Sequence, residues 1–299
     1  EQVFHAFVVL VTLLLSLAVV IPLMSIVFAS FSDPYEVMKH SGLYWKPIKF
    51  SLYNYQMVLQ DKSILTGYMN TIFVVVVGTS LNLVMTIISA YVLSRKGPMF
   101  IKFFTVMIVF TMYFQGGTIP TYIVVDKLHL VGTRWALILP GAVNTFNLVV
   151  LRTAMASVPE SLPESAMIDG AGHATILAKI MVPVTKASIA VITLYYAVAH
   201  WNSWFPAMIY LRKKSMYPLQ LILRTILVQD ETNAMTSGSM EAIALSSDSV
   251  KYATIVVATV PILLVYPFLQ KYFVKGVMVG AVEGCSHDST GNSKCNIQD

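Results

Sequence analysis

The polar residues with the most regular spacing fall within one short segment, PESAMIDGAGHATILAKIMVPV, at positions 163–184. Glu164, Asp169, His173 and Lys179 stand here between two long apolar runs. Carboxylates and cations on one ordered surface are suited to recognition of another protein or of a membrane surface. The residues alone leave two interpretations open: a docking element for a partner protein, and an amphipathic helix that lies at the membrane interface.

Local chemistry predicts a helix, a turn and a second helix in this segment. Ser161 and Glu164 have the spacing of a capping box, in which the hydroxyl and the carboxylate each bind a free backbone amide of the first turn. The helix is expected to end at Gly170, because glycine adopts the left-handed conformation at little cost. A second helix is expected after Gly172, and Pro183 should bend the chain back toward the membrane.

The second helix is predicted to have one apolar face. Its residues follow the i, i+1, i+4, i+5, i+8 spacing of such a face: Ile176, Leu177, Ile180, Met181 and Val184. Lys179 and His173 lie away from the centre of this stripe, so the opposite side of the helix should remain polar.

No catalytic or metal-binding set is recognisable in the sequence. Six histidines and two cysteines supply no metal framework, and both cysteines, Cys285 and Cys295, lie in a polar tail at 285–299. No G-x-x-x-x-G-K-[ST] segment is present, so the sequence shows no phosphate-binding loop of this type. No cofactor is expected in this chain, and its net charge of +5 gives no reason to expect nucleic acid as a partner.

The composition predicts a membrane protein with several spans. Of 299 residues, 56% are hydrophobic and 12% are charged, which is about half the charged fraction of a soluble domain. Uncharged runs such as 7–28 and 67–94 exceed the roughly 20 residues with which a helix crosses a bilayer. We predict an all-α protein, because backbone polar groups in hydrocarbon must bind one another. The six expected spans are 6–29, 68–94, 100–122, 135–155, 188–210 and 253–273.

These spans define the expected domain organisation. Residues 1–284 should form a single transmembrane domain, in which 157–186 is the loop between the fourth and fifth spans. The lysines and arginines do not decide the orientation, because nine of the twenty fall on the side that holds both termini. Arg95 and Lys96, in a short turn, are the informative cations and weakly favour a cytoplasmic location for that side.

The segment at 163–184 resembles the EAA loop of ABC importer permeases, whose pattern is E-A-A, three residues, G, nine residues and I-x-L-P. Here E-S-A at 164–166 precedes Gly170 by three residues, and I-M-V-P at 180–183 follows it after nine. The two departures, Ser165 for alanine and Val182 for leucine, are small.

Motifs elsewhere extend the resemblance to the maltose-type, binding-protein-dependent sugar permeases over the chain as far as residue 284. W-N at 201–202 is similar to a motif of their fifth span, and A-Y at 90–91 with Arg95 to the end of their second span. The run at 270–284 resembles their C-terminal signature. Y-P-L-Q at 217–220 is typical of a branch for complex oligosaccharides.

The resemblance implies that this loop is a cytoplasmic coupling helix that sits in a cleft of an ATPase subunit and moves when two ATPases close on ATP. Glu164 is then the acidic contact, Gly170 the turn, and Asp169 a cap or a contact to a basic residue. An alternative is that Glu164 only closes its own capping box, and the two roles can coexist. The residues assigned to coupling are Glu164, Ser165, Ala166, Asp169, Gly170, Ala171, Ile180 and Pro183.

The resemblance also implies partners and a location. The partners are a second homologous permease subunit in a heterodimer, two ATP-binding cassette subunits that hold ATP and Mg, an extracytoplasmic sugar-binding protein and the lipid bilayer. The chain itself should not be an enzyme. It should cross the bacterial cytoplasmic (inner) membrane several times with both termini in the cytoplasm.

Polar residues within the spans are the candidates for the substrate pathway, because such residues usually face the interior of a bundle or a water-filled cavity. They are Asn82, Gln115, Asn144, Asn147, Tyr195, Tyr196, His200 and Asn202. Sugars bind through aromatic faces and amide hydrogen bonds, which selects Asn144, Asn147, Tyr196, Trp201 and Asn202 as the expected lining. Each could instead be a contact between helices. If R-K-K at 212–214 lies outside the membrane, it is suited to attract an acidic oligosaccharide, such as an alginate or pectin fragment, or an acidic surface of the binding protein.

Three other functions are alternatives to a sugar permease. The first is the permease subunit of an ABC importer for a non-sugar solute. An ion-driven secondary transporter would need buried carboxylates, but the six predicted spans contain no Asp or Glu. A membrane-embedded enzyme would need a Ser/His, paired-carboxylate or metal set at one depth of the membrane, and the spans offer none.

Overall fold

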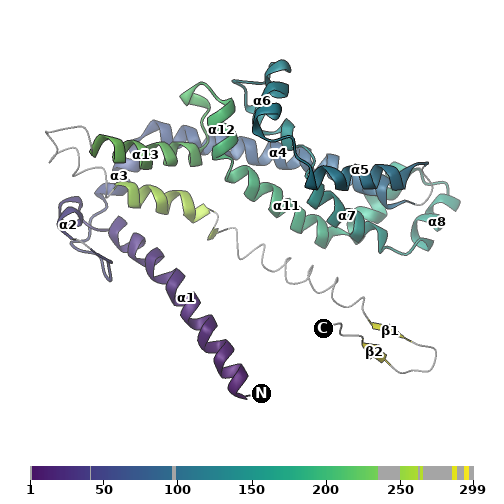
Figure 1. Ribbon diagram of the computed structural model, residues 1–299, viewed down its shortest axis with the longest axis horizontal. Helices are drawn as coiled ribbons and strands as arrows, with labels where there is room; N and C mark the ends of the chain where they lie inside the picture. The colour runs from purple at the N-terminus through teal and green to yellow at the C-terminus, as the bar shows by residue number, and fades with distance from the viewer. Residues whose placement is uncertain are drawn as a thin grey trace. The chain divides into compact units, whose positions relative to one another are not determined.

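The fold is almost entirely helical. The computed structural model describes residues 2–40, 42–95, 99–234, 250–261, 263–264, 285–287 and 293–295. In these residues the only named strands are β1 (Cys285–His287) and β2 (Ser293–Cys295), which pair antiparallel with Cys285 opposite Cys295 (Figure 1). The predicted all-α class therefore holds for the described part of the chain, apart from this short strand pair in the polar tail.

The chain forms two compact units. The first comprises Glu1–Asn70 and Lys214–Leu263, and the second comprises Thr71–Lys213 and Leu264–Asp299. Helix α4 (Lys62–Ser94) contributes residues to both units. The organisation into one transmembrane domain at 1–284 and a tail at 285–299 stays a prediction.

Two helices are long and apolar enough to cross a bilayer without a break. They are α1 (Gln2–Ser30), with 29 residues, and α4, with 33. At 1.5 Å per residue each is over about 40 Å long, which exceeds the roughly 30 Å of bilayer hydrocarbon. Most apolar side chains of α1 are exposed in the isolated chain, as expected for a surface that meets lipid. The first two predicted spans are therefore continuous helices.

Three further helix pairs could cross a membrane only as broken spans. In the first pair, α5 (Ile101–Tyr113) and α6 (Thr118–Lys127) are bent by 115°. In the second, the turns η1 (Arg134–Leu137) and η2 (Leu139–Gly141) meet α7 (Thr145–Ala156) at a bend of 48°. In the third, His173–Val184 meets α11 (Lys186–Trp201) at a bend of 85°. A shorter apolar helix covers Val250–Pro261. The predicted sixth span at 253–273 lies largely outside the described residues.

The breaks fall where the sequence does not continue a helix. Gly117 has a φ of +82°, which only glycine adopts readily, and it separates α5 from α6. Pro140 has no amide donor, and Asn144 caps the start of α7 with its side chain. The predicted span at 188–210 ends its first helix at Trp201 and resumes as α12 (Trp204–Tyr210). Apolar length alone did not reveal these interruptions.

In the first unit, buried polar side chains hold the loop between α1 and α4, which contains α2 (Pro34–Lys39) and α3 (Tyr53–Gln60). Asn54 is fully buried and donates from its amide to the carbonyls of Ser30, at 3.2 Å, and Ser32, at 3.0 Å. The hydroxyl of Ser25 accepts from the amide of Tyr44 at 2.8 Å. These bonds satisfy the free carbonyls at the end of α1 and fix the loop's path.

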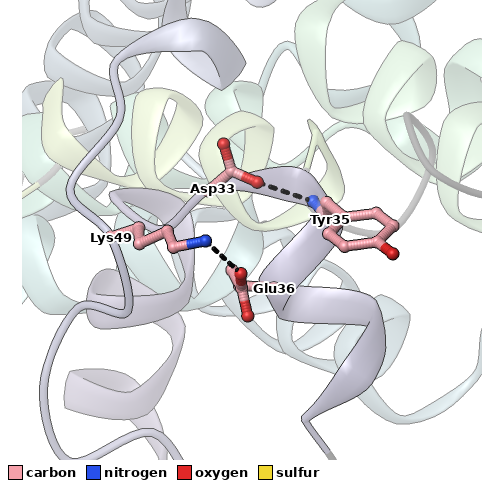
Figure 2. Close-up of polar contacts among 4 residues, drawn as sticks. All are labelled: Asp33, Tyr35, Glu36 and Lys49. Carbon is pink, nitrogen blue, oxygen red and sulfur yellow. Dashed lines mark hydrogen bonds and ion pairs between the residues drawn. The ribbon is translucent and has the colours of Figure 1, made fainter.

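Figure 2 shows the polar contacts around α2. The carboxylate of Asp33 accepts from the amide of Tyr35 at 3.0 Å and caps the helix, and Lys49 forms an ion pair with Glu36 at 2.5 Å. The hydrogen bond from Lys49 lowers the pKa of the Glu36 carboxyl, and the same bond raises the pKa of Lys49. Because Glu36 has the lowered pKa, its contribution is present above the ordinary carboxyl pKa and is lost as the pH falls. The pair is exposed, so it orients the loop more than it stabilises it.

The first unit also contains the turn η4 (Lys214–Met216) and helix α13 (Leu219–Ala234). The buried amide of Asn70 donates to the carbonyls of Ser215, at 2.9 Å, and Tyr217, at 3.1 Å. A Cβ atom on Gly67 would lie 3.2 Å from the Cα of Leu219. The start of α13 is therefore packed against the backbone of α4, and this contact requires glycine at position 67.

The second unit contains a core that joins α4, α7 and α11 to the predicted coupling segment. This segment consists of α8 (Ser161–Ile168), α9 (His173–Ile176), the π-helical turn η3 (Leu177–Met181) and α10 (Val182–Val184). Helices α7 and α11 lie side by side (Figure 1). The buried cluster consists of Ala90, Tyr91, Leu148, Leu151, Met155, Val158, Ile176, Met181 and Ile192. The segment is thus fastened to the membrane helices by apolar packing.

Candidate functional site

Helix α8 begins at Ser161, and the predicted capping box is absent. Ser161 is the first helical residue and not the cap, and no side-chain hydrogen bond caps the helix. The amide of Glu164 instead donates to the carbonyl of Glu160 at 3.1 Å. The prediction was wrong because the helix starts earlier than the motif requires, which places the Ser161 hydroxyl within the first turn. Glu164 is exposed, so its carboxylate is accessible to a partner.

The end of α8 is closed at Gly170, as predicted. This residue has a φ of +83°, and its amide donates to the carbonyl of Met167 at 3.0 Å. The amide of Ala171 donates to the carbonyl of Ala166 at 2.9 Å. The two bonds form a Schellman motif. Ala166 and Ala171 both pack against the buried cluster, so small side chains at these positions bring the turn close to the core.

The apolar face of the second helix is present except at its last position. Ile176 and Met181 are buried, and Leu177 and Ile180 pack against the same cluster. Val184, however, is 54% exposed. The π-helical turn at 177–181 adds a residue to one turn, which rotates all later residues by about 100°. The prediction for Val184 was wrong because it assumed α-helical geometry throughout.

The structure separates the predicted coupling residues into two groups. The exposed residues are Glu164, Ser165, Asp169, Gly170 and Pro183, and the partly buried residues are Ala166, Ala171 and Ile180. The first group forms an accessible surface, and the second group attaches that surface to the core. A docking element needs both groups, because a partner can bind the exposed residues while the partly buried residues transmit force to the core.

A pocket of 870 Å³ lies beside this surface, between the end of α4, the end of α7 and helices α8 and α9. Its charged side chains are Arg95, Glu160 and Glu164, and most of the remaining lining is apolar. On its wall, the hydroxyl of Tyr91 and Nδ1 of His173 are 3.0 Å apart. This mixture of apolar and charged groups resembles a protein-binding surface more than a catalytic site.

A second pocket, of 510 Å³, collects three of the residues predicted for the substrate pathway. Asn144, Asn147 and Tyr196 all line it. The hydroxyl of Tyr196 lies 2.7 Å from Oγ1 of Thr86 and accepts from the amide of Asn144 at 2.9 Å. The side chain of Asn144 in turn accepts from the amide of Asn147 at 3.1 Å and caps α7. One hydrogen-bonded chain therefore connects α4, α7 and α11 at this polar pocket.

The polar pocket is also lined by four polar residues that were not selected as the expected sugar lining: Asn82, Tyr195, His200 and Ser203. Nδ2 of Asn82 lies 3.1 Å from Nε2 of His200, and both residues are buried. Oδ1 of Asn82 and Oγ of Ser203 are buried and have no hydrogen-bond partner among the described residues. Asn82, Tyr195 and His200 were among the polar candidates in the spans, and Ser203 carried no signal of its own.

Trp201 and Asn202 lie outside the polar pocket, and the structure does not group them with the other predicted pathway residues. Tyr196, His200 and Ser203 share one side of the chain, because their spacing of four and three residues matches the helical repeat. Residues 201 and 202 are turned away from that side. The side-chain amide of Asn202 donates to the carbonyl of Val198 at 3.0 Å and caps α11.

The described residues contain no group of three or more His, Cys, Asp or Glu side chains that could hold a metal ion. The second unit instead contains a pocket lined by amide, hydroxyl and imidazole groups, and an exposed surface on α8.

We expect Gly170→Ala to loosen the end of α8 by about 1 kcal/mol, because alanine is strained in the left-handed conformation. No atom lies within 4 Å of the added Cβ, so the backbone conformation is the only source of the cost. Hydrogen exchange of the Ala171 amide should accelerate by about fivefold.

The matched control is Gly172→Ala. Gly172 also has open space at its Cβ position, but its φ of −74° suits any residue. Its exchange should change little. Equal acceleration in both variants would mean that the left-handed turn is not what holds the end of α8.

No protein-family model matches the chain. The chain is 39% identical over 277 residues to the polygalacturonan/rhamnogalacturonan transport system permease protein YtcP of Bacillus subtilis (strain 168), covering 91% of this chain and 95% of that protein. It is 37% identical over 265 residues to protein LplC of the same organism, covering 89% and 90%. The chain also matches a solved structure, the crystal structure of a bacterial ABC transporter involved in the import of the acidic polysaccharide alginate. The TM-score is 0.83 at 30% identity, and the match covers 91% of this chain and 97% of the chain in that structure.

These similarities extend over about nine tenths of each chain, so they concern the whole permease and not a shared motif. They confirm the resemblance inferred from the loop at 163–184 and from the motifs around it. Proteins of this kind are components of ABC transport systems, which include ATPase and binding-protein partners. The chain belongs to the permease subunits of ABC sugar importers: it is a non-catalytic membrane subunit, and ATP is hydrolysed on a separate subunit of the transporter.

Proposed function

We propose that this chain forms one half of the translocation pathway of a bacterial importer for acidic oligosaccharides. The observation that carries the proposal is the polar pocket of the second unit. Asn82, Asn144, Asn147, Tyr196 and Ser203 line this cavity of 510 Å³ and supply amide and hydroxyl groups to it. Amide, hydroxyl and aromatic groups of this kind match the hydroxyls and the apolar faces of a sugar ring.

Two further points support an acidic substrate. One similar protein is named as a permease of a polygalacturonan/rhamnogalacturonan transport system, and the similar solved structure is of a transporter for alginate. All three polysaccharides contain carboxylates. Among the described residues, the lining of the polar pocket includes no Asp or Glu. A sugar carboxylate would therefore meet no like charge on this wall, and like-charge contacts are the usual means by which a site excludes an acid.

The proposed topology has six spans with both termini in the cytoplasm. It is supported by the continuous helices α1 and α4, the bent pairs that contain α5 with α6 and η1 and η2 with α7, helix α11 and the helix at Val250–Pro261, which overlap the six predicted spans in order. In this topology the segment at 157–186 lies between the fourth and fifth spans on the cytoplasmic side. Its exposed residues, with Glu164 as the acidic contact, dock into a cleft of the ATPase subunit.

The proposed assembly contains a second, homologous permease, two ATPase subunits and an extracytoplasmic binding protein. A single permease with broken spans and largely exposed apolar helices requires a partner to enclose a pathway. ATP and Mg are bound by the ATPase subunits, and this chain needs no cofactor.

The experiment compares substrates in the assembled transporter, reconstituted with its ATPase and its binding protein. Oligogalacturonides should stimulate ATP hydrolysis several-fold, and neutral galactose oligomers of equal length should not. In the same system, Asn82→Leu should reduce oligogalacturonide uptake by about tenfold, because it removes an amide from the pocket lining and leaves the buried His200 without that partner.

Asn202→Leu is the matched control for this substitution, because Asn202 lies outside the polar pocket. Its uptake should stay close to that of the native transporter. Stimulation by the neutral oligomers alone would contradict the acidic substrate. Equal losses in both asparagine variants would contradict the assignment of the pocket.

A further inference from the structure

Helix α4 contacts two other elements of the second unit from two different faces. Gly78, Asn82 and Thr86 are spaced by four residues and therefore share one face, which meets α11. Tyr91 and Arg95 are also four residues apart, but they lie on another face and meet the coupling segment. The same helix thus supplies a wall of the polar pocket and a contact to the docking element.

The contact with the coupling segment combines three interactions around Tyr91. This side chain is 6% exposed, and its hydroxyl lies 3.0 Å from Nδ1 of His173. The guanidinium of Arg95 stacks over the Tyr91 ring, 4.8 Å from its centroid. Nη2 of Arg95 lies 2.9 Å from the sulfur of Met181. The end of α4 is therefore joined to both α9 and the π-helical turn.

The hydroxyl of Tyr91 is not needed for packing. Burial at this point is provided by the aromatic ring and its apolar neighbours, which include Ala90, Met155 and Ile176. A phenylalanine ring would occupy the same volume and would still stack with Arg95. What the hydroxyl adds is a directional bond to His173, which fixes the angle between α4 and α9.

The coupling segment is connected to the walls of the polar pocket through the chain and through side-chain contacts. The chain joins it to α7 at one end and, through a bend of 85°, to α11 at the other, and these helices carry Asn144, Tyr196 and His200. Its contacts with α4, which carries Asn82, are the apolar cluster, the Arg95–Met181 contact and the Tyr91–His173 hydrogen bond. The Tyr91–His173 bond is the most directional of these contacts, so its loss would leave α4 freer to lag behind when the segment moves.

We propose that Tyr91 is a positioning residue that makes α4 move together with the coupling segment, so that the two walls of the polar pocket shift as one body during transport. This inference rests on the proposed docking of the segment on the ATPase. Its consequence is that the Asn82–His200 contact is kept while the pathway changes its accessibility. Loss of the Tyr91 hydroxyl uncouples α4 from the segment without removing any group from the pocket.

The first test is a distance measurement that needs no sugar. Spin labels are placed at two exposed positions, Ser80→Cys in α4 and Thr175→Cys in α9, after Cys285 and Cys295 are replaced by serine. In the assembled transporter, the distance should be the same without nucleotide and after trapping with Mg-ATP and vanadate. In Tyr91→Phe the distribution of distances between the two labels should broaden or shift on trapping. An unchanged distance in Tyr91→Phe, with nucleotide retained by the ATPase, overturns the proposal.

The second test is the number of sugar molecules transported per ATP hydrolysed, measured on equal amounts of assembled transporter. Tyr91→Phe should lower this ratio by about fivefold, which corresponds to about 1 kcal/mol for one hydrogen bond. His173→Ala should have a similar effect, and the double variant should be no worse than either single variant. Tyr113→Phe, at a 75% exposed position, is the control and should leave the ratio unchanged.

The outcomes separate this inference from the proposed function. A native transporter that no acidic oligosaccharide stimulates contradicts the proposed substrate, while the distance measurement still decides the role of Tyr91. A ratio that is unchanged in Tyr91→Phe, or additive losses in the double variant, overturns the link. Loss of assembled protein with a normal ratio in the remainder also overturns it, because Tyr91 would then be only structural.

Discussion

Gly78→Ala is expected to destabilise the second unit by about 1–3 kcal/mol and to remove most sugar uptake, although it adds a single methyl group. The new Cβ would lie 2.5 Å from Nε2 of His200 and 2.8 Å from its Cε1. The imidazole cannot simply move aside, because it is buried and pairs with Asn82. Elsewhere in a helix the same change would be stabilising, since alanine is a better helix former than glycine. The measurement is thermal unfolding of the assembled transporter together with uptake.

Two controls isolate the clash. Ser80→Ala lies two residues further along α4 at an exposed position, and it should change neither stability nor uptake appreciably. In a His200→Ala background, the added methyl group has room, so Gly78→Ala should cost little further stability. If the stability losses of the two substitutions add instead, a clash with His200 is not the reason why position 78 requires glycine.

Glu164→Lys is expected to lower coupled uptake by at least about tenfold while the permease itself stays folded. The carboxylate is exposed on α8, so its removal leaves no buried charge unpaired, and exposed substitutions usually change stability by less than about 0.5 kcal/mol. A partner surface that attracts the carboxylate of Glu164 would repel the lysine, and this repulsion weakens binding strongly. Co-purification of the ATPase and sugar-stimulated ATP hydrolysis should fall together with uptake.

Asp126→Lys provides the comparison, because it reverses an exposed carboxylate on α6, within the loop expected on the opposite side of the membrane. It should leave ATPase binding intact. Normal uptake with Glu164→Lys would remove the case for α8 as the docking element. A loss of ATPase binding in both variants would point to net charge and not to a specific contact.

The helix–turn–helix at 161–184 was predictable because its main determinant is local. Gly170 ends α8 for a reason that depends only on backbone sterics, and the apolar spacing from Ile176 to Met181 follows directly from the sequence. The capping box at Ser161 failed because the motif does not specify where the helix begins. Val184 failed because no pattern in the sequence distinguishes a π-helical turn from an α-helical one.

The membrane helices were predictable as apolar segments but not as shapes. Apolar length identified α1 and α4 correctly, and α1 continues as one helix even through Pro22. The third, fourth and fifth segments are broken at Gly117, near Pro140 and after Trp201, and an apolar count takes no account of such breaks. Where a span is broken also decides which polar residues share a side.

The polar pocket shows the same limit at the level of single residues. Asn144, Asn147 and Tyr196 were selected because amides and aromatic faces suit a sugar, and all three line one pocket. Trp201 was selected for its aromatic face, but it does not line that pocket, whereas His200 does. The contribution of Gly78, which has no side chain to suggest a role, follows only from its distance to His200.

The π-helical turn makes the length of the coupling segment as important as its composition. Removal of one residue from Leu177–Met181 would allow an ordinary α-helical turn, but it would turn the apolar residues before it away from the buried cluster. It would also rotate α8, and Glu164 with it, by about 100° relative to α11. A chimaera that exchanges this loop between two permeases must therefore carry the whole interval from Gly170 to Pro183. Grafts that preserve every motif letter but differ by one residue in length would present the wrong side to the ATPase.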